Sequence, residues 1–342
     1  MAVRFTAALS LLLALTPGVA ARDLEPAPRN EAGRFENPGG PLARGSASLR
    51  ISFLLGRVGR SLRAADGGAA RVPNDGSFLR ENAGAGTATV TWVGHATLLV
   101  QMDGLSFLTD PIWSETASPF TFAGPRRLAP PGLSLEDLPP IDFVVISHNH
   151  YDHLDLATLE RLAARSGETR FLVPLGNAEL LRERGIPRVE ELDWGESVRH
   201  ENVTIHCLPA QHWSQRGLFD HNRGLWASWA VTGPSRRFYF GGDTGYFEGF
   251  ESIGAALGPF DLAALPIGAY QPEPMMREAH LNPEEAVQAG VDVRARRAVG
   301  VHFGTFDLAD EALDEPPRRF RAAGVVAGLE VWELSIGETR EF

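Results

Sequence analysis

Cysteine is almost absent from this chain. Cys207 is the only one among 342 residues, so an intrachain disulfide and a cysteine-based zinc framework are both excluded. It lies in the strand-like run VTIHCLPA, where we expect a buried, unreactive thiol rather than a nucleophile. Any metal ion must therefore be held by histidine and carboxylate side chains.

An excess of positive charge is also missing. The chain has 32 lysine and arginine residues against 43 aspartate and glutamate residues, which gives a formal net charge of −11. Nucleic-acid binding favours basic surfaces, so we expect no nucleic-acid partner. The sequence leaves the oligomeric state open, and a homodimer is one of the assemblies it allows.

Long apolar runs are confined to the N-terminus. Residues 1–21 carry one early arginine, a short apolar stretch and small residues at Ala20 and Ala21, which is typical of a cleavable export signal. A membrane anchor or a buried helix is the alternative interpretation. We predict a signal peptide over 1–21 and an exported protein, periplasmic or secreted. No second long apolar run follows, so the mature chain is expected to be soluble or peripheral on a membrane.

Residues 22–87 are predicted to form an N-terminal arm with one amphipathic segment at 46–63. Proline and glycine dominate its first part, which indicates an extended chain. Apolar residues then recur at helical spacing among arginines: Ile51, Leu54, Leu55, Val58 and Leu62. Two interpretations are open, a helix packed on the main domain or a basic amphipathic surface that touches anionic lipid.

Residues 88–342 alternate between strand and helix patterns. Strands are predicted in ATVTWVGHATLLVQMDGLSFLTDP, with a hairpin turn at MDG, and in IDFVVI, RFLVP, FDLAALPIG, AVGVHFG and residues 203–208, 226–232 and 237–241. Helices are predicted in LDLATLERLAAR, NAELLRERG and NPEEAVQAGVDV, with a helical tail at the end. Two strand-rich halves with interspersed helices favour an α/β (α+β) protein, an αββα sandwich of two β-sheets flanked by helices, over a doubly wound parallel sheet.

The stretch SHNHYDHLD concentrates metal-ligand side chains where the strand IDFVVI ends. His148 and His150 alternate in an extended segment, so both imidazoles can point the same way. Asp152 and His153 follow as the chain turns toward a helix, which suits a second ion. Further donors stand at the ends of later strands: His212, Asp243 and His302. Imidazole and carboxylate ligands suit zinc, with iron or manganese as alternatives, and a carboxylate such as Asp243 can bridge two ions.

These motifs resemble those of the N-acyl-phosphatidylethanolamine-hydrolysing phospholipase D family, which belongs to the metallo-β-lactamase superfamily. The same resemblance is seen in the strings WVGHATLLVQMDG, FLTDPIWSETASP, FGGDTGYF, HLNPEEAV and HFGTFDLADE. The resemblance runs from about residue 33 to about residue 311 and implies a metallo-β-lactamase-fold domain over 88–342 with two zinc ions per chain. It places His148, His150 and His212 on one zinc. It places Asp152, His153 and His302 on the other, with Asp243 as the bridge.

Four further residues are assigned supporting or substrate roles. Asp110 in FLTDP matches a superfamily aspartate that supports the ligands from behind, and we expect His95 to buttress the site from a strand turn. His280 matches a family histidine near the phosphate, where it would donate a hydrogen bond or protonate the leaving oxygen. Tyr151, inside the SHNHYDHLD loop, is predicted either to lean over the substrate or to pack against the protein. Of the other histidines, we interpret His200, His206 and His221 as structural.

The resemblance implies hydrolysis of N-acyl-phosphatidylethanolamine to an N-acylethanolamine and phosphatidic acid at a membrane surface, with Asp152, Asp243 and His280 as the catalytic residues. Pro274, Met275 and Met276 stand where more aromatic and basic residues are expected, so selectivity for the N-acyl group is left open. The alternatives are hydrolysis of a lactone, a lactam or another lipid phosphodiester, or a non-catalytic, zinc-dependent membrane-binding protein.

Overall fold

The computed structural model describes residues 24–61, 67–120 and 123–342. The predicted signal peptide at 1–21 lies outside these residues. Within the described ranges, no helix combines the length and the apolar character needed to cross a bilayer.

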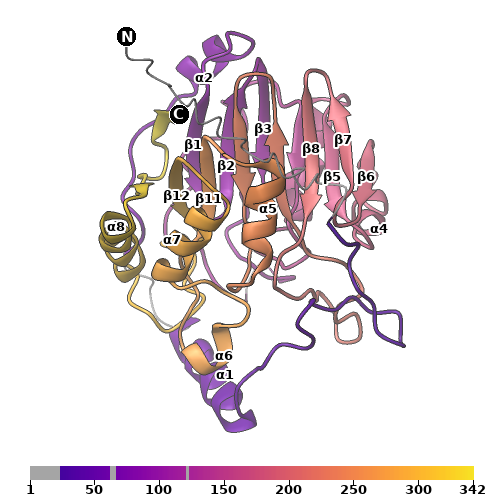
Figure 1. The fold of residues 1–342 in the computed structure, drawn as a ribbon, viewed down its shortest axis with the longest axis vertical. Helices are drawn as coiled ribbons and strands as arrows, with labels where there is room; N and C mark the ends of the chain where they lie inside the picture. The colour runs from indigo at the N-terminus through magenta and orange to yellow at the C-terminus, as the bar shows by residue number, and fades with distance from the viewer. Residues whose placement is uncertain (1–23, 62–66, 121–122) are drawn as a thin grey trace, which may run out of the picture.

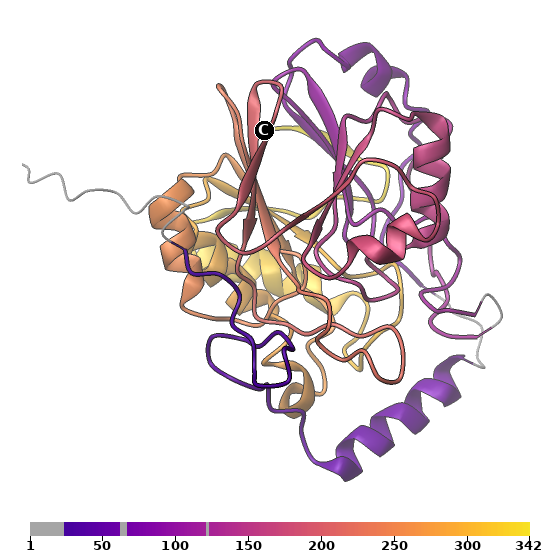
Figure 2. The ribbon, with the colours of Figure 1, turned by 90° about the vertical axis from the view of Figure 1, so that its right-hand side faces the viewer.

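Two seven-stranded mixed sheets pack face to face (Figure 1; Figure 2). In the first sheet, the strand order is β14-β1-β2-β3-β4-β5-β6; neighbours are antiparallel up to β3 and parallel from β3 to β6. Its strands are β1 (Thr89–Gly94), β2 (Thr97–Met102), β3 (Leu105–Thr109), β4 (Phe143–Val145), β5 (Arg170–Pro174), β6 (Val189–Leu192) and β14 (Thr339–Glu341).

The second sheet also has both parallel and antiparallel neighbours, and its strand order is β13-β12-β11-β10-β9-β8-β7. Here β7 to β10 are antiparallel neighbours, and β10 to β13 are parallel neighbours. Its strands are β7 (Ser197–His200), β8 (Val203–Leu208), β9 (Ser228–Thr232), β10 (Arg237–Phe240), β11 (Leu262–Pro266), β12 (Arg297–Val301) and β13 (Glu330–Trp332).

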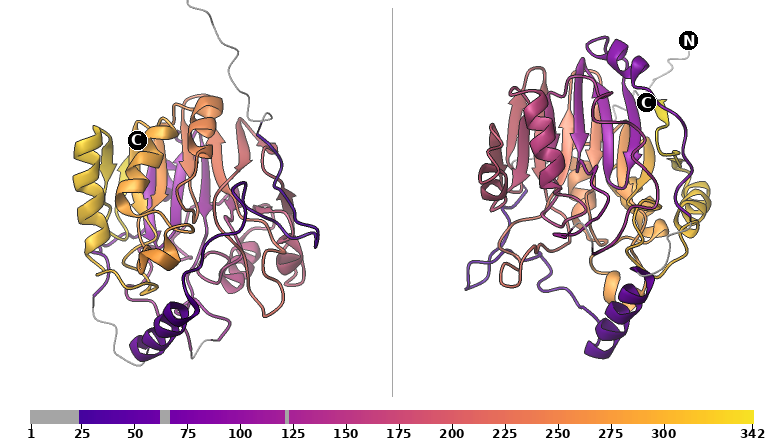
Figure 3. Two further views of the ribbon diagram at one scale, coloured as in Figure 1. Left: turned by 60° about the horizontal axis from the view of Figure 1, so that its bottom comes forward. Right: turned by 180° about the vertical axis from the view of Figure 1, so that it is seen from behind.

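Helices cover both outer faces of this sandwich (Figure 2; Figure 3). The first sheet carries α2 (Ser77–Asn82), α3 (Leu156–Arg165) and α4 (Ala178–Arg182); the second carries α5 (Gly249–Leu257), α7 (Pro283–Asp292) and α8 (Glu315–Ala327). Two helices lie at the lower end in Figure 1, α1 (Ala47–Ser61) and α6 (Glu273–Met276). The predicted αββα architecture is confirmed, and a doubly wound parallel sheet is excluded.

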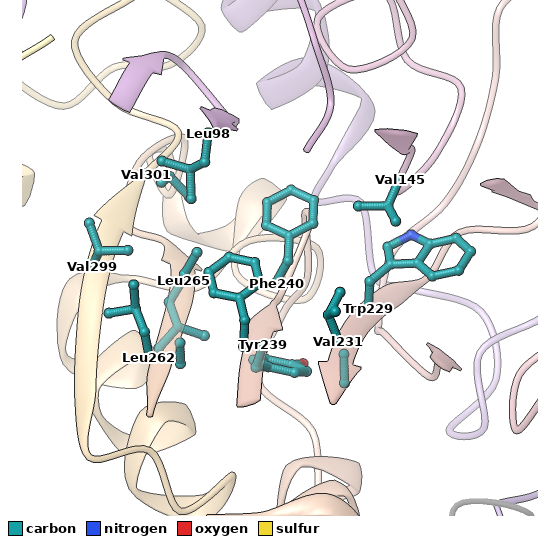
Figure 4. Close-up of a cluster of buried hydrophobic side chains, with 14 of the residues drawn as sticks. Leu98, Val145, Trp229, Val231, Tyr239, Phe240, Leu262, Leu265, Val299 and Val301 are labelled. Carbon is teal, nitrogen blue, oxygen red and sulfur yellow. The ribbon is translucent and has the colours of Figure 1, made fainter. Parts of the chain in front are cut away.

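The core fills the space between the two sheets. Apolar side chains from both sheets meet there, among them Leu98 and Val145 from the first and Phe240 and Val301 from the second (Figure 4). Trp229 on β9 also donates its indole Nε1–H to Ile146 O across the sandwich, at 2.9 Å. This bond fixes the end of β4 immediately before the SHNHYDHLD loop.

The hairpin expected at MDG is present. Asp103 and Gly104 have φ angles of 53° and 83° and connect β2 to β3, as a two-residue turn with positive φ at both positions requires. The predicted helical tail is incomplete: after α8 the chain adds β13 beside β12 and β14 beside β1. Each has only three residues, and pairing with a remote strand, rather than a local pattern, makes them strands.

We predict that Trp229→Phe lowers the free energy of unfolding by about 1–3 kcal/mol, because Ile146 O loses its buried donor. Urea denaturation of both proteins measures the difference. Val326→Thr, at a position 89% exposed on α8, is the control and should change stability by less than about 0.5 kcal/mol. A Trp229→Phe variant as stable as the parent would contradict the bridging role.

Candidate metal centre

The donor side chains gather at one end of the sandwich because the strands that precede them run in the same direction. Asp110 follows β3, the SHNHYDHLD loop follows β4, and His95 turns the chain after β1. From the second sheet, His212 follows β8, Asp243 follows β10 and His302 follows β12. Alternate strands of an antiparallel array point the same way, and parallel neighbours always do, so all these strand ends meet at one edge.

Three histidines form the first donor group. His148 Nε2 lies 2.7 Å from His150 Nδ1, and His212 Nε2 lies 3.3 Å from the same nitrogen. One nitrogen from each of the three rings lies within 4.8 Å of the others, close enough to share an ion. His148 and His212 are fully buried.

The second group combines Asp152, His153 and His302, and the structure adds His95 to it. His302 Nε2 lies 3.2 Å from His153 Nε2 and 3.5 Å from Asp152 Oδ2. His95 Nε2 lies 2.9 Å from the same carboxylate oxygen. His95, which we predicted to support the site, therefore contacts the Asp152 carboxylate directly and is close enough to orient it.

Asp243 lies between the two groups. Its Oδ2 is 3.2 Å from His153 Nε2 and 3.9 Å from His212 Nε2, while its Oδ1 is 3.2 Å from His302 Nε2. Oδ1 is buried and has no hydrogen-bond partner among the described residues. One carboxylate thus faces donors of both groups.

A second layer of hydrogen bonds orients the rings. His153 Nδ1 lies 2.7 Å from Asp110 Oδ2, and His212 Nδ1 lies 2.9 Å from Ala279 O. Each contact engages Nδ1 and leaves Nε2 directed at the cluster, the arrangement that fixes a metal-binding tautomer. Asp110 also accepts the backbone N–H of Ser147 at 2.6 Å, and Ser147 Oγ lies 2.9 Å from His148 Nδ1.

The carboxylates and the histidines of the cluster stabilise each other's charges. Burial alone disfavours the ionised carboxylates, but the neighbouring histidines, His153 above all, hold the pKa values of Asp152 and Asp243 well below the usual range. Burial likewise opposes a charge on His302, yet Asp243 raises its pKa to about 9. Burial lowers the pKa of His148 and that of His212 well below the usual range, which leaves both rings neutral.

This donor set fits two cations. Neutral imidazoles and ionised carboxylates are the ligand forms that zinc and related divalent ions require. His150 Nε2 is buried without a hydrogen-bond partner among the described residues, and Asp243 Oδ1 has only the contact with His302 Nε2, so both are atoms that an ion would satisfy. His148, His150 and His212 would hold one ion, and Asp152, His153 and His302 the other, with Asp243 reaching both.

Backbone geometry is unusual at this edge. His95, Asp110 and His302 have φ angles of 54°, 36° and 64°, a left-handed conformation that costs non-glycine residues about 1–3 kcal/mol each and that clusters at functional sites. Gly242 before Asp243 has φ 59°, and a Cβ there would lie 2.5 Å from Ser147 Cβ. Only glycine allows the loops after β4 and β10 to approach this closely.

A pocket of about 460 Å³ opens from the cluster. Its floor includes His150, Asp152, Asp243 and His302. Its walls are mostly apolar and come from α1, α6 and the adjoining loops: Phe53, Leu54, Trp213, Met275, Met276 and Leu308. His280 also lines it, and its Nδ1 lies 3.8 Å from Asp243 Oδ2.

Tyr151, the predicted substrate contact, is not among the residues that line this pocket. Its hydroxyl donates to Arg216 O at 3.1 Å, and the Arg216 guanidinium lies over its ring at 4.0 Å. The predicted contact with substrate stays a prediction, and the structure shows the packing that was its alternative. Tyr151 packs against the residue that holds the metal loop, because Arg216 Nη1 donates to the carbonyl oxygens of Asn149 and Leu154.

Several residues that hold the proposed ligands or their loop were not predicted from the sequence. Arg216 and Ser147 are two of them, and a third is Trp213, whose ring centroid lies 4.3 Å from that of His150. Asn37 in the N-terminal arm exchanges two hydrogen bonds with the backbone of His212, at 2.9 and 3.0 Å. Trp213 is adjacent to a proposed ligand and could have been suspected, whereas no local signal connects Asn37 with a residue 175 positions away.

Comparison with known proteins agrees with this geometry. Residues 106–303 match the beta-lactamase superfamily domain. Over 238 residues the chain is 49% identical to N-acyl-phosphatidylethanolamine-hydrolyzing phospholipase D 1 of Caenorhabditis elegans, covering 67% of each protein. The chain belongs to the N-acyl-phosphatidylethanolamine-hydrolysing phospholipase D family. It is accordingly a metal-dependent hydrolase of the metallo-β-lactamase superfamily.

A second family relative is the mitochondrial N-acyl-phosphatidylethanolamine-hydrolyzing phospholipase D of Saccharomyces cerevisiae, 36% identical over 67% of this chain. The matched segments span 67% of the nematode protein and half of the yeast protein. Among solved structures, a metallo hydrolase from Ignicoccus hospitalis shares the fold, with a TM-score of 0.58 at 24% identity, over 75% of this chain and 98% of that one.

We expect Asp110→Asn to weaken metal binding about 10–100-fold, the usual effect of losing a carboxylate behind a histidine ligand. Titration against a chromophoric chelator measures affinity independently of activity. Asp314→Asn, whose side chain is 77% exposed, is the matched control and should bind metal as the parent does. Equal affinities for all three proteins would show that Asp110 does not orient a ligand.

Proposed function

We propose that this family member is a dizinc phosphodiesterase of the phospholipase D type. It hydrolyses N-acyl-phosphatidylethanolamine to an N-acylethanolamine and phosphatidic acid. The observation that carries the proposal is the position of Asp243: it faces two groups of metal-ligand side chains and also forms part of the floor of an apolar pocket. The names of the nematode and yeast relatives support the same substrate.

Bound zinc ions would supply Lewis acidity for the phosphoryl oxygens and make water a better nucleophile at neutral pH. The chain's own residues hold and orient the reactants. Asp243 and Asp152 bring negative charge to the pocket floor, and His95 holds the Asp152 oxygen that also faces His302. Burial lowers the pKa of His280 to about 4, so its ring is neutral near pH 7 and can donate a hydrogen bond to a phosphoryl oxygen.

The walls of the pocket suit a lipid. Its volume of about 460 Å³ lies within the range of small-molecule sites, and aliphatic side chains from α1 and α6 line the approach to the cluster. Met275 and Met276 are flexible and apolar, and such side chains adapt to acyl groups of different shape. This lining favours tolerance of several N-acyl groups over selection of one.

A panel of three substrates tests the proposed reaction. Purified protein with zinc is incubated with N-acyl-phosphatidylethanolamine, a lactone and a β-lactam, and products are identified by mass spectrometry. We expect an N-acylethanolamine and phosphatidic acid from the lipid, with the release abolished by a chelator and by Asp243→Asn. Turnover of only the lactone or the lactam would reject the phosphodiesterase proposal.

His280→Gln is expected to lower kcat/KM about 10–100-fold, because one hydrogen bond to a charged oxygen contributes about 1.5–3 kcal/mol. Bound zinc, measured in the same samples, should be unchanged. His200→Gln, outside the pocket lining, is the control and should leave both quantities unaltered. A loss of zinc in His280→Gln would instead make His280 a metal ligand, as its position near His212 and Asp243 allows.

A further inference from the structure

His302 differs from three other proposed ligands on the side of its ring that faces away from the cluster. Those three each have a hydrogen-bond partner at Nδ1: His148, His153 and His212. His302 Nε2 faces Asp152 and His153, whereas its Nδ1 is buried and has no hydrogen-bond partner among the described residues. A buried ring nitrogen of this kind calls for a partner, either a protein group or an ordered water.

A small cavity lies beside His302. Its volume is about 20 Å³, and its lining comes mostly from the loop that follows β12, together with Ala269 of the loop that follows β11. One water molecule needs about 10–15 Å³ and two to four polar partners, so the cavity has room for one water. Two carboxylate side chains are among the lining residues, Asp307 and Glu311.

Glu311 is the carboxylate best placed to bind such a water. Among the described residues it forms no ion pair with a basic side chain, whereas Asp307 Oδ1 accepts a hydrogen bond from Arg57 Nη1 at 2.7 Å. Burial raises the pKa of the Glu311 carboxyl, and its backbone hydrogen bonds and the charge on His302 oppose this shift. The Glu311 carboxylate is therefore close enough to His302 to interact with it electrostatically.

The same carboxylate fixes the loop that follows β11. Glu311 Oε1 accepts the N–H of Ala269 at 2.5 Å, and Oε2 accepts the N–H of Gln271 at 3.1 Å. Ala269 has a φ angle of 63° and lines the large pocket that opens from the cluster. Because each carboxylate oxygen can accept more than one hydrogen bond, Glu311 can hold this loop and still accept a hydrogen bond from a water.

The two loops approach each other closely along their backbones. A Cβ at Gly268 would lie 2.3 Å from His302 O, so only glycine allows this contact. Asp310 N also donates to Gln271 O at 3.2 Å. The position of the Glu311 carboxylate relative to His302 is consequently fixed by backbone contacts and hydrogen bonds, which is what a group that orients a ligand requires.

We propose that Glu311 is a positioning residue for His302 and acts through one bound water. The water accepts the Nδ1–H of His302 and donates a hydrogen bond to the Glu311 carboxylate. This bridge keeps the proton on Nδ1 and leaves the Nε2 lone pair for a metal ion, as Asp110 does for His153 by direct contact. The proposal rests on the proposed function in one respect, that the cluster binds two zinc ions.

A crystal structure of the zinc-loaded parent protein tests the bridge directly. We expect one ordered water in the cavity, within about 3.2 Å of both His302 Nδ1 and a Glu311 oxygen. A cavity without this water, or a water that contacts only one of the two residues, would overturn the proposal. This test requires no variant and so does not depend on how well a substituted protein folds.

Zinc titration of Glu311→Gln tests the positioning role without measuring activity. The two zinc affinities are measured against a chromophoric chelator, and His302→Gln, which removes the ligand itself, shows which of them belongs to the ion at His302. In Glu311→Gln we expect that affinity to fall about 10–100-fold and the other to stay unchanged. Asp314→Asn, at an exposed position of the same loop, is the matched control and should bind both ions as the parent does.

Equal losses at both ions would indicate a general structural effect of Glu311→Gln and would overturn the proposal, as would the absence of any loss. Lipid cleavage separates this proposal from the phosphodiesterase proposal. If the parent binds two zinc ions and contains the bridging water but cleaves no phosphodiester, only the proposed function fails. If the parent cleaves N-acyl-phosphatidylethanolamine but lacks the water or the selective loss of zinc, only the positioning proposal fails.

Discussion

Two ionised carboxylates among seven imidazoles are the constraint on which the rest of this structure depends. Asp152 and Asp243 stay ionised at the edge of an apolar sandwich, where burial by itself would neutralise them. Positive charge must therefore be present close by. Protonated His153 and His302 provide it when no ion is bound, and divalent cations would provide it in the working enzyme.

The scaffold meets this constraint through hydrogen bonds that fix the proposed metal ligands on the side away from the cluster. Asp110, Ser147 and Ala279 O set the ring orientations, and Arg216 holds the loop between Asn149 and Leu154. Across the sandwich, Trp229 fixes the backbone just before that loop. Donors that come from separate strands of both sheets can thus hold one geometry, since each is anchored to a rigid element rather than to another loop.

The N-terminal arm connects the cluster with the outer surface. Asn37 holds the backbone of His212, Arg44 lies over Trp213, and α1 completes the pocket wall. The helix contacts the main domain through the ion pair of Arg57 with Asp307, as the first interpretation of the amphipathic segment expects. Contact of this segment with anionic lipid stays a prediction.

The sequence by itself determined the sandwich class, the hairpin at Asp103 and seven metal-ligand candidates that the structure gathers at one edge, because alternation, turn chemistry and ligand spacing are local signals. It did not determine β13 and β14, whose three residues become strands only beside β12 and β1. Nor did it predict the supporting role of Asn37 or the packing of Tyr151 on Arg216. Those depend on contacts between residues far apart in the chain, which only the tertiary structure brings together.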